Sequence, residues 1–295
     1  YAFLTPSLSY DANNVFLTLA LQGNAFSGFG GNTPNQRSVG YALDQTYASA
    51  SGDFATVIGA LANLSITQAG PALDAISGQQ YADFGTTNVN TSAMFMNTLG
   101  QQMALARSGA GSGQRVALAL ACEVEACDTA RPLSAWFSGL GGLGSVQGNT
   151  NASTLTYNFG GAAAGIDYRL APNILLGLGV GYTHGTQWVN SFMGQGWSDS
   201  VSVAAYGSFT TAGFYADALA GYAYFNNQMQ RQIQIPGLQP RTASGSTGAN
   251  QFLTQIETGY GLPVFGEKLT ATPFARLQFS TTTQNGFSES GAQSL

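Results

Sequence analysis

The sequence predicts a mainly β fold containing a transmembrane antiparallel β-barrel. Charged residues make up only 8% of the 295-residue chain, against about 25% in an ordinary soluble domain. No uninterrupted apolar run approaches the ~18 residues that a membrane helix requires. From Leu133 onward, apolar and polar residues alternate along segments separated by turns, as in barrels with a lipid-facing and a lumen-facing side. A secreted, repetitive β-structure is the alternative with the same composition.

The first residues predict two short strands. In the segment 1–22, Val15, Leu17 and Leu19 alternate with the residues between them, and Asp11 opens a stretch of turn-forming residues. Glycine, asparagine, serine and proline then dominate residues 23–36, which indicates a loop.

The apolar spacing becomes helical over about 35–107. Phe54, Ile58 and Leu61 fall on one helical face. A further helix, rich in methionine, is expected within about 89–107, where methionines at this spacing indicate core packing.

Residues 108–132 form a linker with a cysteine loop. Its two cysteines, Cys122 and Cys127, flank Glu123 and Glu125 without a nearby histidine, so a zinc site is poorly supported. A local disulfide suits an oxidising compartment; two free thiols in a mobile loop are the alternative.

About seven strands are expected after Leu133. They are 134–146, 153–170, 174–188, 198–211, 213–227, 249–263 and 268–282. The connections at 170–173 and 210–213 are tight, whereas 190–197 and about 236–248 are expected as long loops, the layout of an outer-membrane barrel. Because bacterial single-chain barrels have an even number of strands, the odd count indicates either that one strand is missed in this count or that the chain stops inside the barrel.

The glycine-rich segment GLGGLG places Gly139, Gly141 and Gly144 in the spacing G-x-G-x-x-G. Nucleotide binding is excluded because no helix opens after the third glycine, as the dinucleotide fold requires. The alternative is a glycine-rich strand whose missing side chains leave room for something inside the barrel.

The sequence predicts no catalytic, cofactor-binding or metal-binding residue. The only histidine, His184, lies at the end of a strand and is expected to be an exposed loop residue. No G-x-S-x-G motif accompanies it. The net charge of −5, without a basic stripe, excludes a nucleic-acid partner.

Five charged residues are expected to face the barrel lumen: Asp167, Arg169, Asp217, Glu257 and Arg276. Charges inside a barrel need partners or water. They indicate either a hydrated polar pore or structural pairing that holds neighbouring strands and a plug.

The order of these parts resembles the autotransporter family of type V secretion. The resemblance rests on YAFLTPSLSYDANNVFLTL, NQRSVGYALD, GDFATVIGALANLS, MFMNTLGQQMALAR, ACEVEACDTARPLSAWFSGLGGLGSV and GGAAAGIDYRLAPNILLGLGVGYTHG. It implies a short β-helix end of a passenger at 1–34, a helical junction at 35–107, a linker at 108–132, and the N-terminal part of the barrel at 133–295.

The resemblance also implies a helix in the lumen, within about 89–107. Small residues would admit this helix: Gly139, Gly141, Gly144, Gly161, Ala163, Gly165, Gly177 and Gly179. The family barrel has twelve strands and a terminal aromatic residue, so a chain of about seven strands ending in Leu295 is expected to lack the last strands. A start at Tyr1, without a signal peptide, indicates an internal piece of a longer chain.

The function implied by the resemblance is that of an outer-membrane translocator in a Gram-negative bacterium. It would secrete or display its own N-terminal passenger, without enzymatic activity or a cofactor. Its partners would be the lipid bilayer, its passenger, the barrel-assembly machinery and periplasmic chaperones. The alternatives are the surface anchor of an adhesive or structural protein, and a porin-type or enzyme-type barrel. Some relatives cleave an Asn–Asn bond in the lumen helix, but Asn88, Asn90 and Asn97 have no adjacent asparagine.

Overall fold

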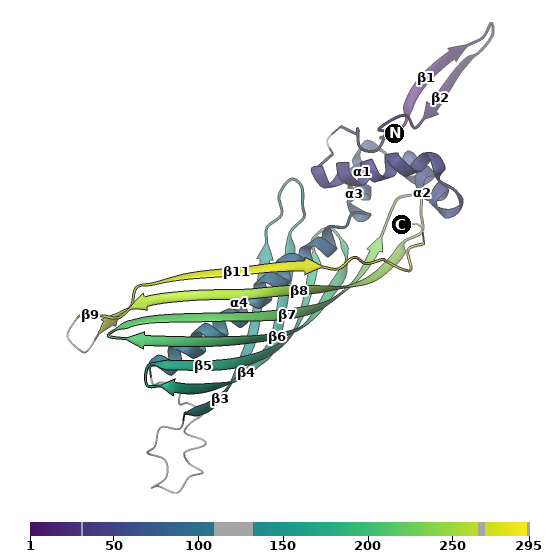
Figure 1. Ribbon diagram of the computed structural model, residues 1–295. Helices are drawn as coiled ribbons and strands as arrows, with labels where there is room; N and C mark the ends of the chain where they lie inside the picture. Colours follow the sequence, from purple (N-terminus) through teal and green to yellow (C-terminus); the bar gives the residue numbers. More distant parts are fainter. Residues whose placement is uncertain (31, 109–131, 265–268, 294–295) are drawn as a thin grey trace.

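A curved antiparallel sheet lies along one long helix in the computed structural model (Figure 1), which describes residues 1–30, 32–108, 132–264 and 269–293. Three shorter helices lie beyond one end of the sheet, and a narrow hairpin projects past them. The helices are α1 (Pro34–Thr46), the short 3₁₀ helix η1 (Tyr47–Ser49), α2 (Gly52–Ala62), α3 (Ile66–Ala75) and α4 (Gln79–Ser108).

The sheet contains seven strands in the order β11-β8-β7-β6-β5-β4-β3. Consecutive strands of the chain pair as antiparallel hairpins from β3 to β8, and β11 then pairs with β8. The strands are β3 (Leu133–Val146), β4 (Leu155–Ala171), β5 (Ile174–Val189), β6 (Met193–Thr211), β7 (Phe214–Ile233), β8 (Arg241–Tyr260) and β11 (Phe274–Gln284). Between β8 and β11, the short strands β9 (Leu262–Pro263) and β10 (Thr270–Ala271) pair with each other.

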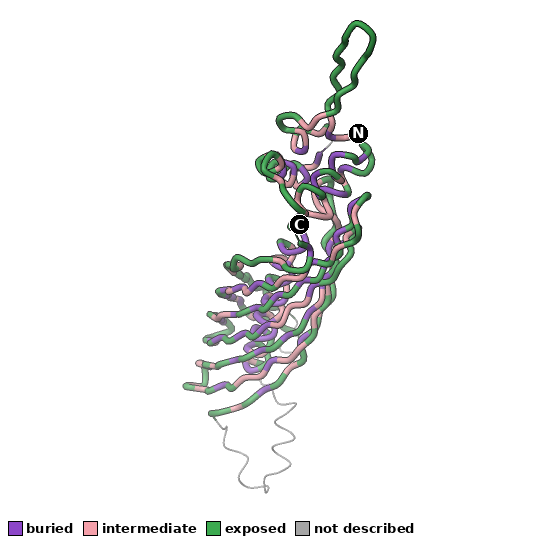
Figure 2. Tube along the Cα trace, turned by 90° about the vertical axis from the view of Figure 1, so that its right-hand side faces the viewer, coloured by how far each residue is buried: buried purple, intermediate pink, exposed green. Residues whose placement is uncertain are grey.

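Burial alternates from residue to residue along the strands, as Figure 2 shows. In β7, Asp217 and Leu219 are buried against the helix side, whereas Ala218, Ala220 and Tyr224 are exposed on the opposite side. Successive strand residues point to opposite faces, so the predicted alternation is confirmed. The side facing α4 is called the inner face below, and the other side is called the outward face.

The strand connections differ in length at the two ends of the sheet. The β6–β7 turn is tight because Ala212 and Gly213 both have positive φ, 44° and 84°, the combination that a two-residue hairpin turn requires. The two loops expected to be long, 190–197 and about 236–248, are shorter in the structure than expected. Residues 193–197 belong to β6 and 241–248 belong to β8, because pairing with β7 extends both strands through glycine- and serine-rich sequence.

The projecting hairpin consists of β1 (Thr5–Tyr10) and β2 (Val15–Ala20), which confirms the two expected strands. Its turn is held by the Asp11 carboxylate, which accepts the backbone N–H groups of Asn13 at 2.8 Å and Asn14 at 2.7 Å. Figure 2 shows this hairpin exposed on all sides.

The helices α1 to α3 share one apolar core with the end of the sheet. Phe26, Leu61 and Leu73 are fully or almost fully buried in it, together with Ile233 at the end of β7 and Ile235 just after it. The first helix starts at a capping box of Thr33 and Gln36. The helical segment therefore packs against the sheet and is not joined to it by the chain connection alone.

Two arginines reinforce this junction between helices and sheet. Arg231 of β7 binds both carboxylate oxygens of Glu289, at 2.8 and 2.5 Å, and donates to the Ala75 carbonyl at 2.9 Å. Arg241 of β8 binds both oxygens of Asp53 in α2 at 2.7 Å. Bidentate arginine–carboxylate pairs fix geometry as well as adding energy.

Candidate functional site

The candidate site is the helix α4 and the inner face that surrounds it. The helix contacts each of the strands β3 to β8 and also β11. It begins at Gln79, ten residues before the expected start at about 89, and continues to Ser108. Across the parts of the chain that the structure describes, no helix is both long and apolar enough to cross a membrane.

Close packing against α4 depends on glycines in β5. A Cβ atom added at Gly179 would lie 2.8 Å from a Leu99 methyl carbon, and one at Gly181 would lie 2.9 Å from the Phe95 ring. Real Cβ atoms do not approach other atoms so closely. Phe95 and Leu99 of α4 are at most 1% exposed in the cluster that these glycines admit.

The GLGGLG segment lies in β3, and its glycines point to both faces of the sheet. Trp136 and Leu140 are buried on the inner face, and Gly144 lies on that face beside the Tyr157 ring. Gly139 and Gly141 are exposed on the outward face, which corrects the expectation that all three face the lumen. Residues an odd number of positions apart cannot share a strand face. The next element after β3 is the strand β4 rather than a helix.

Asp167 is 1% exposed and joins α4 to three strands. It accepts a hydrogen bond from the Gln102 amide of α4 at 2.9 Å and another from the Tyr206 hydroxyl. Tyr206 in turn accepts the Trp136 indole N–H at 2.6 Å. A buried carboxylate is tolerated when such donors satisfy it.

The last turn of α4 is held by a second set of charges. Arg107 forms an ion pair with Asp217, which is 2% exposed, and its guanidinium lies 3.8 Å over the centre of the Tyr215 ring. Arg169 of β4 donates to the Ala106 carbonyl at 3.0 Å. A cation at a helix C-terminus complements the helix dipole.

Glu257 and Arg276 form an ion pair beside this helix end. Tyr215 donates its hydroxyl hydrogen bond to Glu257 at 2.7 Å, and Arg276 reaches Asn97 of α4 at 3.0 Å. The structure thus places the five charged residues expected in the lumen on the inner face, each in contact with α4 or with a residue that contacts it.

Strand register explains why these charges meet. One line across the sheet joins directly paired residues: Arg169, Leu175, Ser208, Asp217, Glu257 and Arg276. Directly opposite residues on paired strands have Cβ atoms about 5 Å apart. Charges far apart in the sequence therefore form one polar belt around the end of α4.

Sequence reasoning did not identify a second polar region near the start of α4. Thr87 donates to the Gln187 side-chain oxygen at 2.8 Å, and the Gln187 amide donates to the Gln80 carbonyl at 3.0 Å. Ser92 donates to Gln251 at 2.5 Å. The alternation of the strands places both glutamines on the inner face, so their positions in the sequence are the signal for this region.

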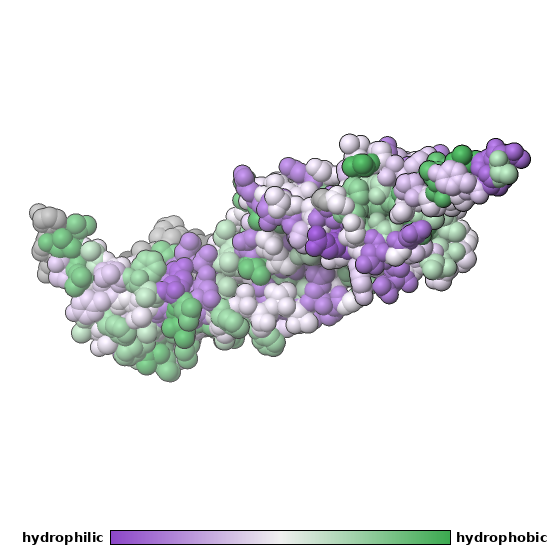
Figure 3. All heavy atoms as spheres, turned by 90° about the horizontal axis from the view of Figure 1, so that it is seen from above, coloured by the Kyte–Doolittle hydropathy of each residue, from purple (hydrophilic) through white to green (hydrophobic). Residues whose placement is uncertain are grey.

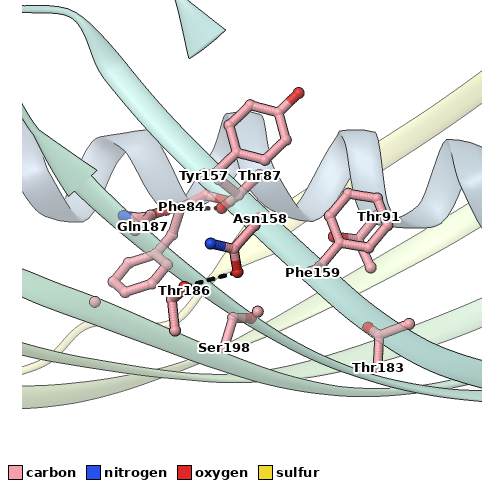
Figure 4. Close-up of a pocket in the computed structure, with 12 residues that line it drawn as sticks. Phe84, Thr87, Thr91, Tyr157, Asn158, Phe159, Thr183, Thr186, Gln187 and Ser198 are labelled. Atoms are coloured by element: carbon pink, nitrogen blue, oxygen red, sulfur yellow. Dashed lines mark hydrogen bonds between the residues drawn. The ribbon is translucent and has the colours of Figure 1, made fainter. Parts of the chain in front are cut away.

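A small pocket lies between α4 and the strands β4 to β6 (Figure 4). Phe84 and Thr87 of α4 contribute to its lining, as do Tyr157 and Phe159 of β4. Among the described residues that line it, none is charged and none is histidine or cysteine. Its lining offers packing surfaces and hydrogen-bonding groups.

His184 lies inside β5, on the outward face, rather than in the expected loop. Its Nδ1 atom is 3.0 Å from an Asp199 carboxylate oxygen, which also accepts the Tyr182 hydroxyl at 2.7 Å. Within the described ranges, no three His, Cys, Asp or Glu side chains are grouped to hold a metal ion. The expected disulfide between Cys122 and Cys127 falls outside the described residues.

Comparison with known proteins connects this architecture to a family. Two proteins of Serratia marcescens, each named extracellular serine protease, are 26% and 24% identical to this chain over 216 residues. These matches cover 73% of this chain and 19% of each relative. The chain therefore spans about a fifth of the length of the curated relatives it matches. The solved translocator domain of autotransporter NalP from Neisseria meningitidis is 16% identical, with a TM-score of 0.48, covering 64% of this chain and 62% of that one.

The family assignment rests on the match to a family model. Residues 135–295, which begin within β3 and include the rest of the seven-stranded sheet, match the model described as the autotransporter beta-domain. This match spans more than half of the chain, and the chain belongs to the autotransporter beta-domain family.

Proposed function

We propose that this chain is the translocator part of an outer-membrane protein that secretes or displays its own N-terminal passenger. The observation that carries the proposal is a polar inner face that holds a helix, on a sheet whose outward face is apolar. This arrangement suits a wall between lipid and a hydrated channel. The outward face would contact lipid, and the inner face would guide the chain that leaves through the channel.

The outward face supports the membrane part of the proposal. Leu176, Leu178 and Val180 of β5 are 49–59% exposed, and Val201 and Val203 of the neighbouring β6 are 55% and 46% exposed. Soluble monomers rarely expose large continuous apolar patches. Figure 3 shows hydrophobic surface gathered toward the end of the sheet that is far from the hairpin.

The direction of α4 supports the secretion part. Its C-terminal turn lies beside Arg169 and Asp217, near the tight β4–β5 and β6–β7 turns. Its N-terminus leads back through α3, α2 and α1 to the projecting hairpin at the opposite end (Figure 1). Short turns mark the periplasmic side of such barrels, so the chain before α4 would emerge on the cell surface.

We propose the domain division 1–34, 35–107, 108–132 and 133–295 on the same grounds. The hairpin would belong to the end of the passenger, and α1 to α4 would form the junction. The chain after Leu133 would be barrel wall. Asp167, Arg169, Asp217, Glu257 and Arg276 would line the lumen together with Gly144.

The partners of the whole protein belong to the proposal as well. Besides the outer-membrane bilayer and its own passenger, we expect barrel-assembly machinery and periplasmic chaperones to act on the chain. An apolar outward face must be protected from water before insertion, which explains the need for such helpers. We assign no catalytic step to this part of the protein, because its proposed role is to guide the passenger through the channel and to anchor it in the membrane.

Ion conductance across planar bilayers tests the proposal with full-length protein. Deleting residues 85–110 removes most of α4 and should raise single-channel conductance several-fold, while surface display of the passenger falls. His184→Ala, on the outward face, is the matched control and should leave both measurements unchanged. Equal conductance with and without 85–110 would contradict a helix in the channel and favour an open porin or an anchor.

A further inference from the structure

The side chains on the outward face change from apolar to polar at one line across the sheet. In β5 the outward side chains from Ile174 to Tyr182 are apolar or aromatic. The eight steps of about 3.3 Å between these nine residues span about 26 Å of strand, and nine residues agree with the 9–11 of a membrane-spanning strand. Through the register, Tyr182 is followed across the sheet by Val201, Tyr224 and Asn250. This line marks the outer limit of the apolar band.

The strands β5 to β8 continue past that limit, toward the junction helices. The first row of outward side chains past the limit contains His184 and Asp199, whose Nδ1 and carboxylate oxygen atoms are 3.0 Å apart. Beyond that row lies a surface that we call the outer strip: Trp188, Gln195, Trp197, Gln228, Gln230 and Ser246. Register places them side by side, because Trp197 is opposite Gln228 and Gln195 is opposite Gln230. Trp188 is 39% exposed, and the glutamines are exposed.

The chemistry of the outer strip is unusual for a surface that meets only water. Its side chains are amides, a hydroxyl and two indoles, and the nearest carboxylate on this face of β6 is that of Asp199, two residues from Trp197 and beside His184. Exposed surface is ordinarily rich in charged side chains. Uncharged hydrogen-bonding groups beside flat aromatic rings match a ligand that combines hydroxyl groups with apolar C–H faces, which describes a neutral sugar.

The height of the strip above the lipid distinguishes two kinds of headgroup. Trp188 is six residues beyond Tyr182, or about 20 Å along the strand. At the usual strand tilt of about 40° this is roughly 15 Å above the apolar band. Phospholipid headgroups extend only about 5–8 Å beyond the hydrocarbon on each side. A glycolipid headgroup of several sugars reaches the strip, and a phospholipid headgroup does not.

We propose that the outer strip binds the neutral sugars of glycolipid headgroups in the outer leaflet of the membrane. The indole of Trp188 and that of Trp197 would stack on sugar rings, while Gln228 and Gln230 would exchange hydrogen bonds with sugar hydroxyls. One row of residues, which includes His184 and Asp199, separates the strip from the apolar band that contacts the lipid chains. The headgroup of a glycolipid whose chains cover the band would reach the strip across that row. The inference uses the outer-membrane location and goes beyond secretion of the passenger.

The test compares two glycolipids in bilayer nanodiscs that contain the full-length protein. One glycolipid carries a complete core oligosaccharide, and the other is truncated to its lipid anchor and innermost acidic sugars. We expect the protein to retain at least fivefold more of the complete glycolipid after purification. The double variant Trp188→Ser/Trp197→Ser should lose this preference, and Tyr10→Ser on the distant hairpin should keep it.

Folding and secretion are measured in the same variants, by heat-dependent gel mobility and by passenger display on cells. If the tryptophan variant fails to fold, the variant Gln228→Ala/Gln230→Ala tests the proposal in its place. We expect its preference for the complete glycolipid to fall threefold. Equal retention of the two glycolipids, or an undiminished preference in a folded variant, would overturn the proposal. Passenger display should remain normal in both variants. Because display reports secretion and glycolipid retention reports sugar binding, failure of the glycolipid proposal and failure of the proposed function are measured separately.

Discussion

The ion pair between Arg107 and Asp217 allows a quantitative test of how α4 is held. The Asp217 side chain is 2% exposed, and one of its oxygens has no hydrogen-bond partner among the described residues. Arg107→Met would leave this carboxylate buried without its cation. Removing one partner of a buried pair costs about 3–5 kcal/mol. Because Arg107 itself is 16% exposed, we expect a loss near the lower end, about 3 kcal/mol.

Removing the charge from both partners should restore part of that stability. In Arg107→Met/Asp217→Asn, the buried group is a neutral amide, so the double variant should lose only about 1–2 kcal/mol. Asp217→Asn alone should cost about 1 kcal/mol, since the amide oxygen still accepts a hydrogen bond from the arginine. The double variant is therefore expected to be more stable than Arg107→Met alone.

The assay is urea unfolding of the full-length protein in lipid vesicles, followed by tryptophan fluorescence and by gel mobility. Arg37→Met is the matched control, because Arg37 is exposed on α1, and it should change stability by less than about 0.5 kcal/mol. A double variant as unstable as Arg107→Met would refute the reasoning. So would an effect of Arg107→Met no larger than that of the control.

Three further predictions concern packing and the junction. Gly179→Val should destabilise the protein by about 1–3 kcal/mol through overpacking against α4, whereas Gly139→Ala, with open space around its Cβ position, should have little effect; thermal unfolding compares the two. Burial opposes ionisation of Glu289, but its bonds to Arg231 lower the pKa of Glu289 below its ordinary 4.5. The stability from this group is therefore present above about pH 4.5 and lost as the pH falls through the folded pKa; protease protection of the junction should fall in acid, and Glu289→Gln should remove that pH dependence. Arg241→Met should speed protease cleavage within α1 to α3 several-fold while leaving the gel mobility of the barrel unchanged, and equal cleavage rates would argue against this contact as an anchor.

Much of the fold follows from local pattern in the sequence. The two-residue period after Leu133 predicts about seven strands with their apolar and polar faces, and the described residues form a seven-stranded sheet with those faces. The expected start of the last strand, at 268, is wrong, because residues 270–271 pair with 262–263 and β11 begins only at Phe274. The residues after Asp11 predicted the turn of the hairpin, because an aspartate side chain can bind the backbone N–H groups that follow it. Helical spacing predicted the helical segment between the hairpin and the sheet, although α4 starts earlier than expected.

The errors have a common origin in pairing between strands. Glycine and serine at 241–248 predicted a loop, because composition alone cannot report that β7 provides a partner for every residue of this segment. The glycine spacing of the GLGGLG segment predicts that all three glycines face the lumen, and this is wrong for two of them. Alternation within a strand separates Gly139 and Gly141 from Gly144, since neighbouring positions point to opposite faces.

The sequence by itself determined which faces are apolar, where the helical segment lies, and which charges fall on the inner face. These properties depend on the two- and 3.6-residue periods of strands and helices, which are local. Only the tertiary structure decided that Arg169, Asp217, Glu257 and Arg276 lie on one line around the end of α4. That line depends on strand register, and register is set by pairing between segments far apart in the chain.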